Sequence, residues 1–174
     1  RFITPPWSIG CFLLRRKIKF EFLFYFENRL GIQRCQGAQM NIARFFDREA
    51  ASNAFLHAIG TDEQKPASFF LSRMLGFDFS YPDGNCVVEF NVRDFMFNPQ
   101  GSLHGGVISL AMDASMGHLL YNLRTAGTTL ELKTQFLRPV ASGRVKAVGR
   151  MIRRGQSICF MQSEFVGADG ELSA

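Results

Sequence analysis

The sequence is poor in the residues that build disulfides, metal sites and reactive thiols. It has four cysteines in 174 residues, and no two of them stand in a Cys-x-x-Cys spacing. The four are Cys11, Cys35, Cys86 and Cys159. Their scatter argues against both a disulfide framework and a zinc site, and reduced thiols fit a cytoplasmic protein. Cys86 and Cys159 lie in apolar, strand-like runs, so we interpret them as small buried hydrophobic residues.

Acidic residues are scarce only near the beginning of the chain, where the positive charge gathers. Residues 1–39 carry seven Lys and Arg against two Glu, an excess that equals the formal net charge of the whole chain, +5. Residues 40–174 carry thirteen charges of each sign and are neutral overall. A nucleic-acid partner needs a basic face that contacts phosphates. Because the body has no such excess, we expect no nucleic-acid partner.

Residues 1–39 also differ in composition from the rest of the chain, since they are rich in Phe, nearly free of Ser and hold a basic cluster at 15–19. Their apolar stretches fall far short of the roughly 20 residues of a membrane-spanning helix, so we expect no membrane span. Two interpretations stay open. The segment is a mitochondrial transit peptide, which would place the protein in mitochondria rather than the cytoplasm, or it is upstream sequence that does not belong to the fold.

We therefore expect a domain over residues 40–174 with its last strand truncated. If residues 1–39 do not belong to the fold, the true start is Met40. Apolar spacing predicts helices over 41–59 and 66–75, and His57 on the first of them is interpreted as structural. The expected strands run over 74–80, 85–95, 127–137, 144–152 and 156–166, and the truncated one comes after the turn at 168–170. Short turns between strands favour an antiparallel sheet.

Residues 105–120 interrupt this pattern, because apolar side chains there occupy every side of a helix. A helix without a polar face must be buried. The sequence therefore predicts an α+β fold with one long buried helix and an antiparallel sheet.

One carboxylate, Asp113, stands inside this apolar helix. An uncompensated buried carboxylate is costly, so Asp113 either has dedicated structural partners or has been retained for chemistry. The helix begins at His104-Gly105-Gly106, where unpaired N–H groups and the positive end of the helix dipole point outward. A thioester carbonyl could approach the Gly105 N–H closely and be polarised by it. The alternative interpretation is that the two glycines only allow the helix to begin and bind nothing.

The helical rise separates these two groups. Gly105 and Asp113 are eight positions apart, which is about 12 Å along one helix. Reacting atoms must lie within roughly 3 to 3.5 Å of each other, so one helix cannot use both groups on one carbonyl carbon. Two antiparallel copies related by a two-fold axis would bring Gly105 of one near Asp113 of the other. The hypothesis therefore predicts an obligate homodimer with two shared sites.

The combined spacing of Asn98, Gly101, residues 103–106 and Asp113 resembles the phenylacetate-pathway (PaaI-like) hotdog thioesterases. The resemblance continues through 128–132, 136–140 and 153–156, and it covers about residues 75–174. It implies a hotdog fold, in which a curved antiparallel sheet wraps a long central helix. It also implies that Asp113 activates water or attacks directly, while the Gly105 N–H polarises the thioester. Asn98 would position the water or substrate, with His104 in support.

The same resemblance implies a set of residues that bind the acyl-CoA substrate. They are Gly106, Thr129, Phe136, Leu137, Arg138, Pro139, Arg153, Arg154, Gly155 and Gln156. The arginines of this set suit the phosphates of CoA. The alternative is that they are charged residues of turns that contact only solvent. No cofactor and no metal are implied, since thioester cleavage needs only water and a base. His118, over 100° around the helix from Asp113, is interpreted as structural.

Three functions remain. The first is an acyl-CoA thioesterase, acting as a homodimer or a dimer of dimers. The second is a hotdog hydratase or dehydratase, although no partner His accompanies Asp113 in the sequence. The third is a non-catalytic acyl-CoA sensor, which would not need Asp113. The acyl group is not identified: Phe95, Phe97, Met112 and Met116 would line a tunnel or simply fill the core.

Overall fold

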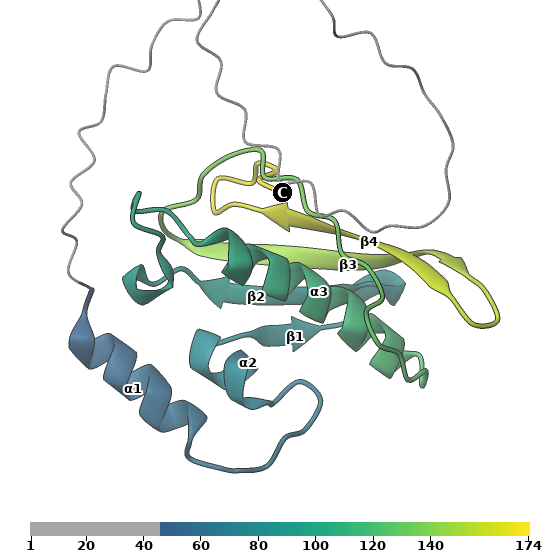
Figure 1. Cartoon of the computed structure of the whole chain (residues 1–174), viewed down its shortest axis with the longest axis horizontal. Coiled ribbons are helices and arrows are strands. Elements are labelled where there is room, and N and C mark those ends of the chain that lie inside the picture. Colours follow the sequence, from purple (N-terminus) through teal and green to yellow (C-terminus); the bar gives the residue numbers. More distant parts are fainter. Residues whose placement is uncertain (1–45) are drawn as a thin grey trace, which may run out of the picture. The chain divides into compact units, whose positions relative to one another are not determined.

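A computed structural model describes residues 46–174 and shows a long helix packed on one antiparallel sheet, with two shorter α-helices beside each other (Figure 1). The predictions for residues 1–39, for Cys11 and Cys35, and for a start at Met40 lie outside these residues. The elements are α1 Arg48–Ala58, α2 Phe70–Leu75, β1 Asp78–Ser80, η1 Pro82–Gly84, β2 Cys86–Asn91, η2 Asp94–Met96, α3 Gly105–Asn122, β3 Arg144–Arg154 and β4 Cys159–Val166. Within this part of the chain, no helix is long and apolar enough to cross a membrane.

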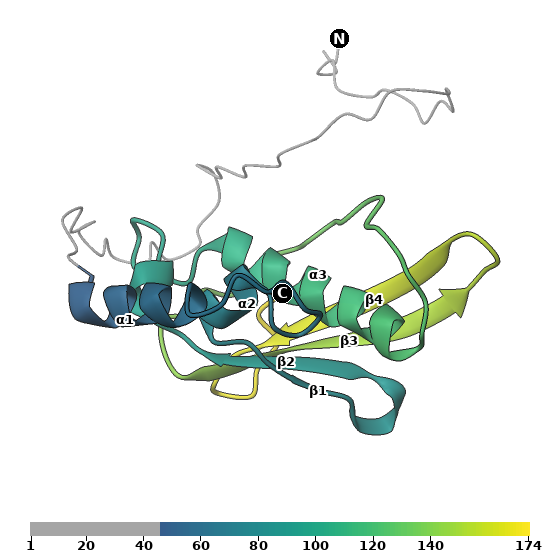
Figure 2. The same ribbon diagram turned by 90° about the horizontal axis from the view of Figure 1, so that it is seen from below.

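The four strands form a sheet in the order β1-β2-β3-β4, and every neighbouring pair is antiparallel. Alternate residues of β2 and β3 are buried, as expected for strands with one face on a core. Figure 2 shows α3 lying across this face of the sheet. The predicted α+β architecture, with a long central helix against an antiparallel sheet, is confirmed.

The central helix α3 is buried along the side that faces the sheet, where Ile108, Ala111 and Leu119 are nearly inaccessible. Its other side is less covered within the single chain. Asp113 and Met116 are half-buried there, and Gly117 is exposed. The sequence predicted a helix buried on every side. Within residues 46–174 only the side that faces the sheet is buried, and the opposite side leaves Asp113, Met116 and Gly117 within reach of molecules outside the chain.

The helix α3 lies very close to the sheet at Gly149 of β3. A Cβ at this position would lie 2.6 Å from the Ser115 carbonyl carbon and 2.7 Å from the Ser115 Oγ. The Ser115 hydroxyl is itself fixed, since it donates to the Met112 carbonyl at 2.7 Å and lies 2.9 Å from the Ser163 Oγ. The backbone of Ser115 and its hydroxyl, which is held by two hydrogen bonds, cannot easily move aside. Only glycine therefore fits at position 149.

Replacing Gly149 by Ala is therefore expected to destabilise the fold by about 1–3 kcal/mol, because the new methyl group must push α3 away from β3. Lys146→Ala, on the exposed face of the same strand, should change stability by less than about 0.5 kcal/mol. Urea denaturation followed by circular dichroism measures both. Equal stability of the two variants would contradict the close packing.

Several predicted boundaries were wrong. The strand expected over 74–80 begins only at Asp78, because Met74 and Leu75 belong to α2 and Gly76 takes a left-handed conformation at φ 68°. The strand expected over 127–137 does not form. Within the described residues no strand lies beside it, and its backbone bonds to another element are those of Leu137 and Arg138 with the Ser173 carbonyl. The expected last strand is reduced to a bridge between Val166 and Leu172.

Candidate active site

The loop before α3 is held by Asn98. Its Nδ2 donates to the Ser102 Oγ at 3.0 Å, and its Oδ1 accepts from the Ser102 backbone N–H at 3.2 Å. Backbone bonds join the same two residues, and the Gly101 N–H donates to the Asn98 carbonyl. The sequence predicted Asn98 near the site as a positioning residue. In this structure its amide is engaged inside its own loop and shapes the entry to α3.

His104 is the N-cap of α3, and its Nδ1 accepts the Gly106 N–H at 2.9 Å. A nitrogen that accepts a hydrogen bond carries no proton, so a neutral His104 ring has its proton on Nε2. The Val107 and Ile108 N–H groups donate to the His104 carbonyl. Among residues 46–174 the Gly105 N–H has no acceptor. The cap thus leaves one unpaired donor at the positive end of the helix.

The Phe136 ring lies close to Gly105. A Cβ on Gly105 would lie 3.0 Å from the Phe136 ring, which is itself 55% exposed. Gly105 therefore brings the backbone close to an aromatic side chain that has room to move. The sequence predicted both residues for the site but not their contact.

Asp113 is half-buried on α3, and its Oδ1 accepts a hydrogen bond of 2.7 Å from the Thr129 hydroxyl. Both residues were predicted for the site, and the structure brings them together. Gly105 and Asp113 lie on the same uninterrupted helix, so the separation of about 12 Å applies. The structure does not bring these two groups together within one chain.

Residues 127–136 run antiparallel along α3 and tie the site together. A Cβ on Gly127 would lie 2.9 Å from Leu120, near the end of the helix. The Thr129 bond to Asp113 comes next, and the Ser109 hydroxyl then donates to the Thr134 Oγ1 at 3.3 Å. Sequence reasoning missed Ser109 and Thr134. The one feature of the sequence that could have indicated them is their position between residues predicted for the site. Ser109 lies between Gly105 and Asp113, and Thr134 lies between Thr129 and Phe136.

The residues predicted to hold CoA fall into two groups at different places. Leu137, Arg138 and Pro139 are exposed beside Phe136, whereas Arg153, Arg154, Gly155 and Gln156 are exposed at the β3–β4 hairpin. Arg138 pairs with Asp169 at 2.9 Å and Glu171 at 3.6 Å, so its charge is compensated within the chain. Arg154 donates to the Thr125 Oγ1 at 2.8 Å, just beyond the end of α3. The two groups thus lie toward opposite ends of the helix.

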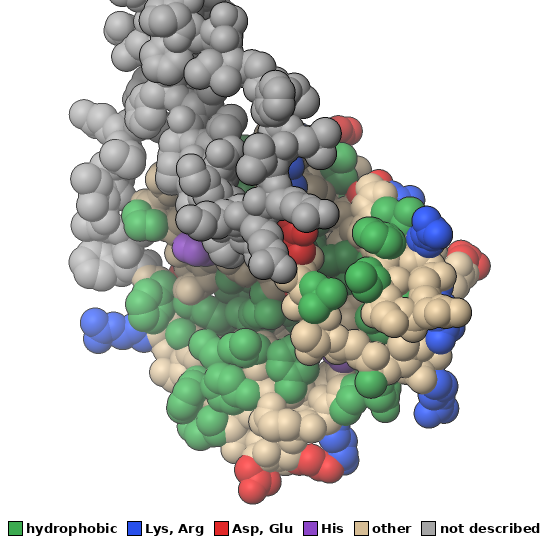
Figure 3. Space-filling view, turned by 45° about the vertical axis from the view of Figure 1, so that its right-hand side comes forward, with side chains coloured by type: hydrophobic (Ala, Val, Ile, Leu, Met, Phe, Trp, Pro, Cys, Tyr) green, Lys and Arg blue, Asp and Glu red, His purple; other side chains and the backbone are tan. Residues whose placement is uncertain are grey.

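Exposed apolar side chains gather on one face of the molecule. In the view of Figure 3, hydrophobic side chains gather in the middle of the face and charged ones lie around its rim. Four of the large exposed apolar residues belong to the segment beside α3, namely Leu130, Leu132, Phe136 and Leu137.

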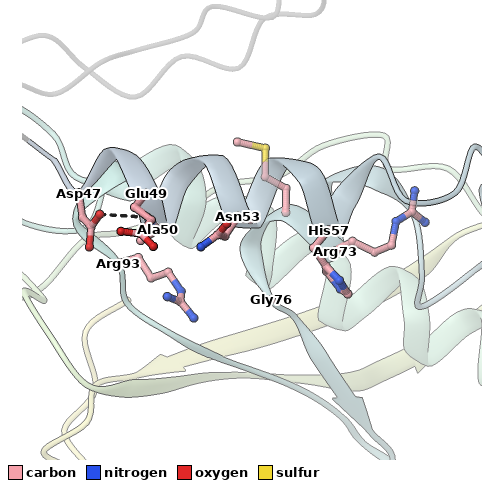
Figure 4. Close-up of a pocket in the computed structure, with 10 residues that line it drawn as sticks. Asp47, Glu49, Ala50, Asn53, His57, Arg73, Gly76 and Arg93 are labelled. Atoms are coloured by element: carbon pink, nitrogen blue, oxygen red, sulfur yellow. Dashed lines mark hydrogen bonds between the residues drawn. The ribbon is translucent and has the colours of Figure 1, made fainter.

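A cavity of about 510 Å³ lies elsewhere, and it contains none of the predicted active-site residues (Figure 4). Asp47, Asn53 and His57 line it from the α1 side, and Arg93 lines it from the loop after β2. Arg73, also in its wall, donates to the carbonyls of Ala58, Thr61, Glu63 and Ser68. Arg73 therefore holds the connection between α1 and α2, and this cavity is a polar gap beside that connection.

The other candidate groups fit structural roles. Cys86 is buried, and burial raises its pKa to about 12, so it is no nucleophile near neutral pH. Cys159 is half-buried on β4. His118 is buried and stacks on Phe79 with ring centroids 3.9 Å apart, and burial lowers its pKa. Among the described residues, no group of His, Cys, Asp and Glu could hold a metal ion.

The family comparison covers the part of the chain that holds Gly105, Asp113 and Thr129. Residues 100–174 match the family model of the thioesterase superfamily. The fold is the hotdog fold. A curated protein of Saccharolobus solfataricus, named as an inferred esterase, is 34% identical over 93 residues, covering 52% of this chain and 66% of that protein. The match thus spans slightly less than two thirds of that relative.

Solved structures are similar over more of the chain. A Ralstonia eutropha protein, described as an inferred thioesterase related to phenylacetic acid degradation, is 26% identical with a TM-score of 0.55. The match covers 70% of this chain and 93% of that one. A Bacillus halodurans protein solved with CoA has a TM-score of 0.60 at 18% identity, covering 72% and 83% of the two chains. At that identity the likeness shows the fold alone.

Proposed function

We propose that this protein is an acyl-CoA thioesterase that hydrolyses the thioester to a free acid and CoA. The observation that carries the proposal is the pair of groups on α3: a Gly105 N–H at its positive end that has no acceptor among residues 46–174, and Asp113 held by Thr129. A donor at a helix N-terminus stabilises the oxyanion of acyl transfer, and a positioned carboxylate supplies the base or nucleophile. The thioesterase-superfamily match and the esterase relative support this reaction.

In the reaction, the Gly105 N–H donates to the thioester oxygen as negative charge develops there. Asp113 either takes a proton from water, whose oxygen attacks the carbonyl carbon, or attacks that carbon itself and forms an anhydride that water then hydrolyses. In both routes the carbon–sulfur bond breaks and the CoA sulfur leaves as a thiolate that takes up a proton. The hydroxyl of Thr129 fixes the Asp113 carboxylate for this role.

The active unit is a homodimer. Because about 12 Å separates Gly105 from Asp113 on one helix, the two groups act on one carbonyl only if they come from different subunits. Antiparallel α3 helices across a two-fold axis would pair them twice. The same arrangement would bring residues 153–156 of the partner subunit toward Phe136 and Arg138, and so unite the two predicted CoA-binding groups. A dimer of dimers stays a prediction, as does a cytoplasmic location.

Release of free thiol from a panel of acyl-CoAs tests the proposal directly. Acetyl-, butyryl-, octanoyl- and phenylacetyl-CoA should be presented at equal concentration, with a thiol reagent as the readout. We expect at least one to be hydrolysed by protein that sediments as a dimer. Binding of the panel without thiol release would favour the acyl-CoA sensor, and water addition to an enoyl-CoA would favour the hydratase.

A further inference from the structure

Gly117 stands one helical turn beyond Asp113, on the same side of α3. Four residues advance a helix by about 6 Å and rotate it by little more than one turn. Apart from its chain neighbours and the adjacent backbone of its own helix, a Cβ built on Gly117 meets no atom of residues 46–174 within 4 Å, and the residue is exposed. The space beside the carboxylate is therefore open toward the C-terminal end of the helix.

Nothing in the packing of residues 46–174 requires this glycine. Gly149 must lack a side chain because Ser115 lies against it, and five other glycines take positive φ angles. Gly117 has neither reason: it has ordinary helical backbone and empty space above it. Glycine is among the poorest residues for a helix interior. A small residue here serves something that lies outside the single chain.

The surroundings of Gly117 indicate what occupies the space. On the N-terminal side of Asp113, the Ser109–Thr134 hydrogen bond closes the helix surface with polar groups. On the C-terminal side, the half-buried Met116 and Leu120 flank the opening and are apolar. Residues 127–136, which run along α3, contact the helix at Asp113 and at Leu120 but not at Gly117.

We infer that Gly117 forms the floor of the acyl-binding space and sets the size of the acyl group that the enzyme accepts. This inference rests on the proposed function, since it places the thioester carbon beside Asp113. The acyl group then extends along α3 toward Met116 and Leu120, away from the Ser109–Thr134 pair. The substrates are acyl-CoAs whose acyl part is apolar and larger than acetyl, of medium-chain or aryl type.

The test places a larger side chain in the space above Gly117. Gly117→Leu adds four carbon atoms one turn from Asp113, while Gly117→Ala adds one. Asn122→Leu, at the exposed end of the same helix, is the matched control for a new leucine. The kcat/KM of each variant is measured with acetyl-, octanoyl- and phenylacetyl-CoA. Leucine favours helix more than glycine does, so the variants should fold, and circular dichroism verifies this.

We expect Gly117→Leu to lower kcat/KM for octanoyl- and phenylacetyl-CoA by about tenfold or more, and for acetyl-CoA by less than about threefold. Gly117→Ala should fall between this variant and the wild type. An equal loss for every substrate, no loss for any, or a wild type that hydrolyses acetyl-CoA alone would overturn the inference.

Binding separates this inference from the proposed hydrolysis. Dissociation constants are measured for non-hydrolysable thioether analogues of acetyl- and octanoyl-CoA. The wild type could hydrolyse nothing while Gly117→Leu loses affinity for the octanoyl analogue alone. This result would reject the proposed hydrolysis and support the acyl-binding space at Gly117. If neither analogue binds, or both lose affinity equally, the inference about Gly117 fails whatever the activity.

Discussion

Asp113→Asn is expected to reduce kcat for thioester hydrolysis by about 10²–10⁴-fold, because an amide can neither take a proton from water nor attack the carbonyl carbon. The substitution keeps the size of the side chain, and its Oδ1 can still accept the hydrogen bond from Thr129. Substrate affinity should therefore change little. The effect is measured as thiol release at saturating acyl-CoA, with the dissociation constant of a thioether analogue measured in parallel.

Glu131→Gln makes the same chemical change on an exposed carboxylate of the neighbouring segment and should keep nearly full activity. Hydrolysis that survives Asp113→Asn would reject Asp113 as base or nucleophile. A loss of both affinity and activity would mean that Asp113 holds the site in shape rather than performs the chemistry.

The sequence predicted the central helix and the groups on it because these are local features. The helix begins with Gly105 as predicted, since a capping residue, two glycines and an apolar run are adjacent in the chain. The spacing of Gly105 and Asp113 is likewise a property of one regular helix. Thr129 came only from the resemblance to a family, yet its bond to Asp113 gives that position a physical reason.

What the sequence did not predict depends on contacts between distant residues. Residues 127–137 have strand-like composition, but a strand exists only where a neighbour pairs with it, and the described chain provides none there. Arg138 looked available for a phosphate because its partners, Asp169 and Glu171, come some thirty residues later. The position of the Phe136 ring close to Gly105 likewise arises from the path of the chain along α3.

Gly105→Pro is expected to lower kcat by about 10²–10³-fold, because it removes one oxyanion donor and little else. Proline is favoured at the first position of a helix, and His104, at φ −62° and ψ 132°, already has the extended backbone that a residue before proline prefers. The lost N–H has no acceptor in residues 46–174. Gly105→Ala keeps the N–H and makes the same new contact with Phe136, so it is the matched control.

The two inactive variants together test whether the site is shared between subunits. A heterodimer is prepared from one Asp113→Asn subunit and one Gly105→Pro subunit, with a different affinity tag on each. If each site takes Gly105 from one subunit and Asp113 from the other, one site has both intact groups and the other has neither. The purified heterodimer should then recover about half of the wild-type activity.

If both groups acted within one subunit, each site of the heterodimer would carry one defect and activity would stay at the level of the inactive parents. A wild-type subunit paired with a double variant, Gly105→Pro and Asp113→Asn, gives the opposite result for the two arrangements. It is nearly inactive when sites are shared and half active when they are not. The two heterodimers therefore test whether the separation of Gly105 and Asp113 along the helix forces each active site to use both subunits.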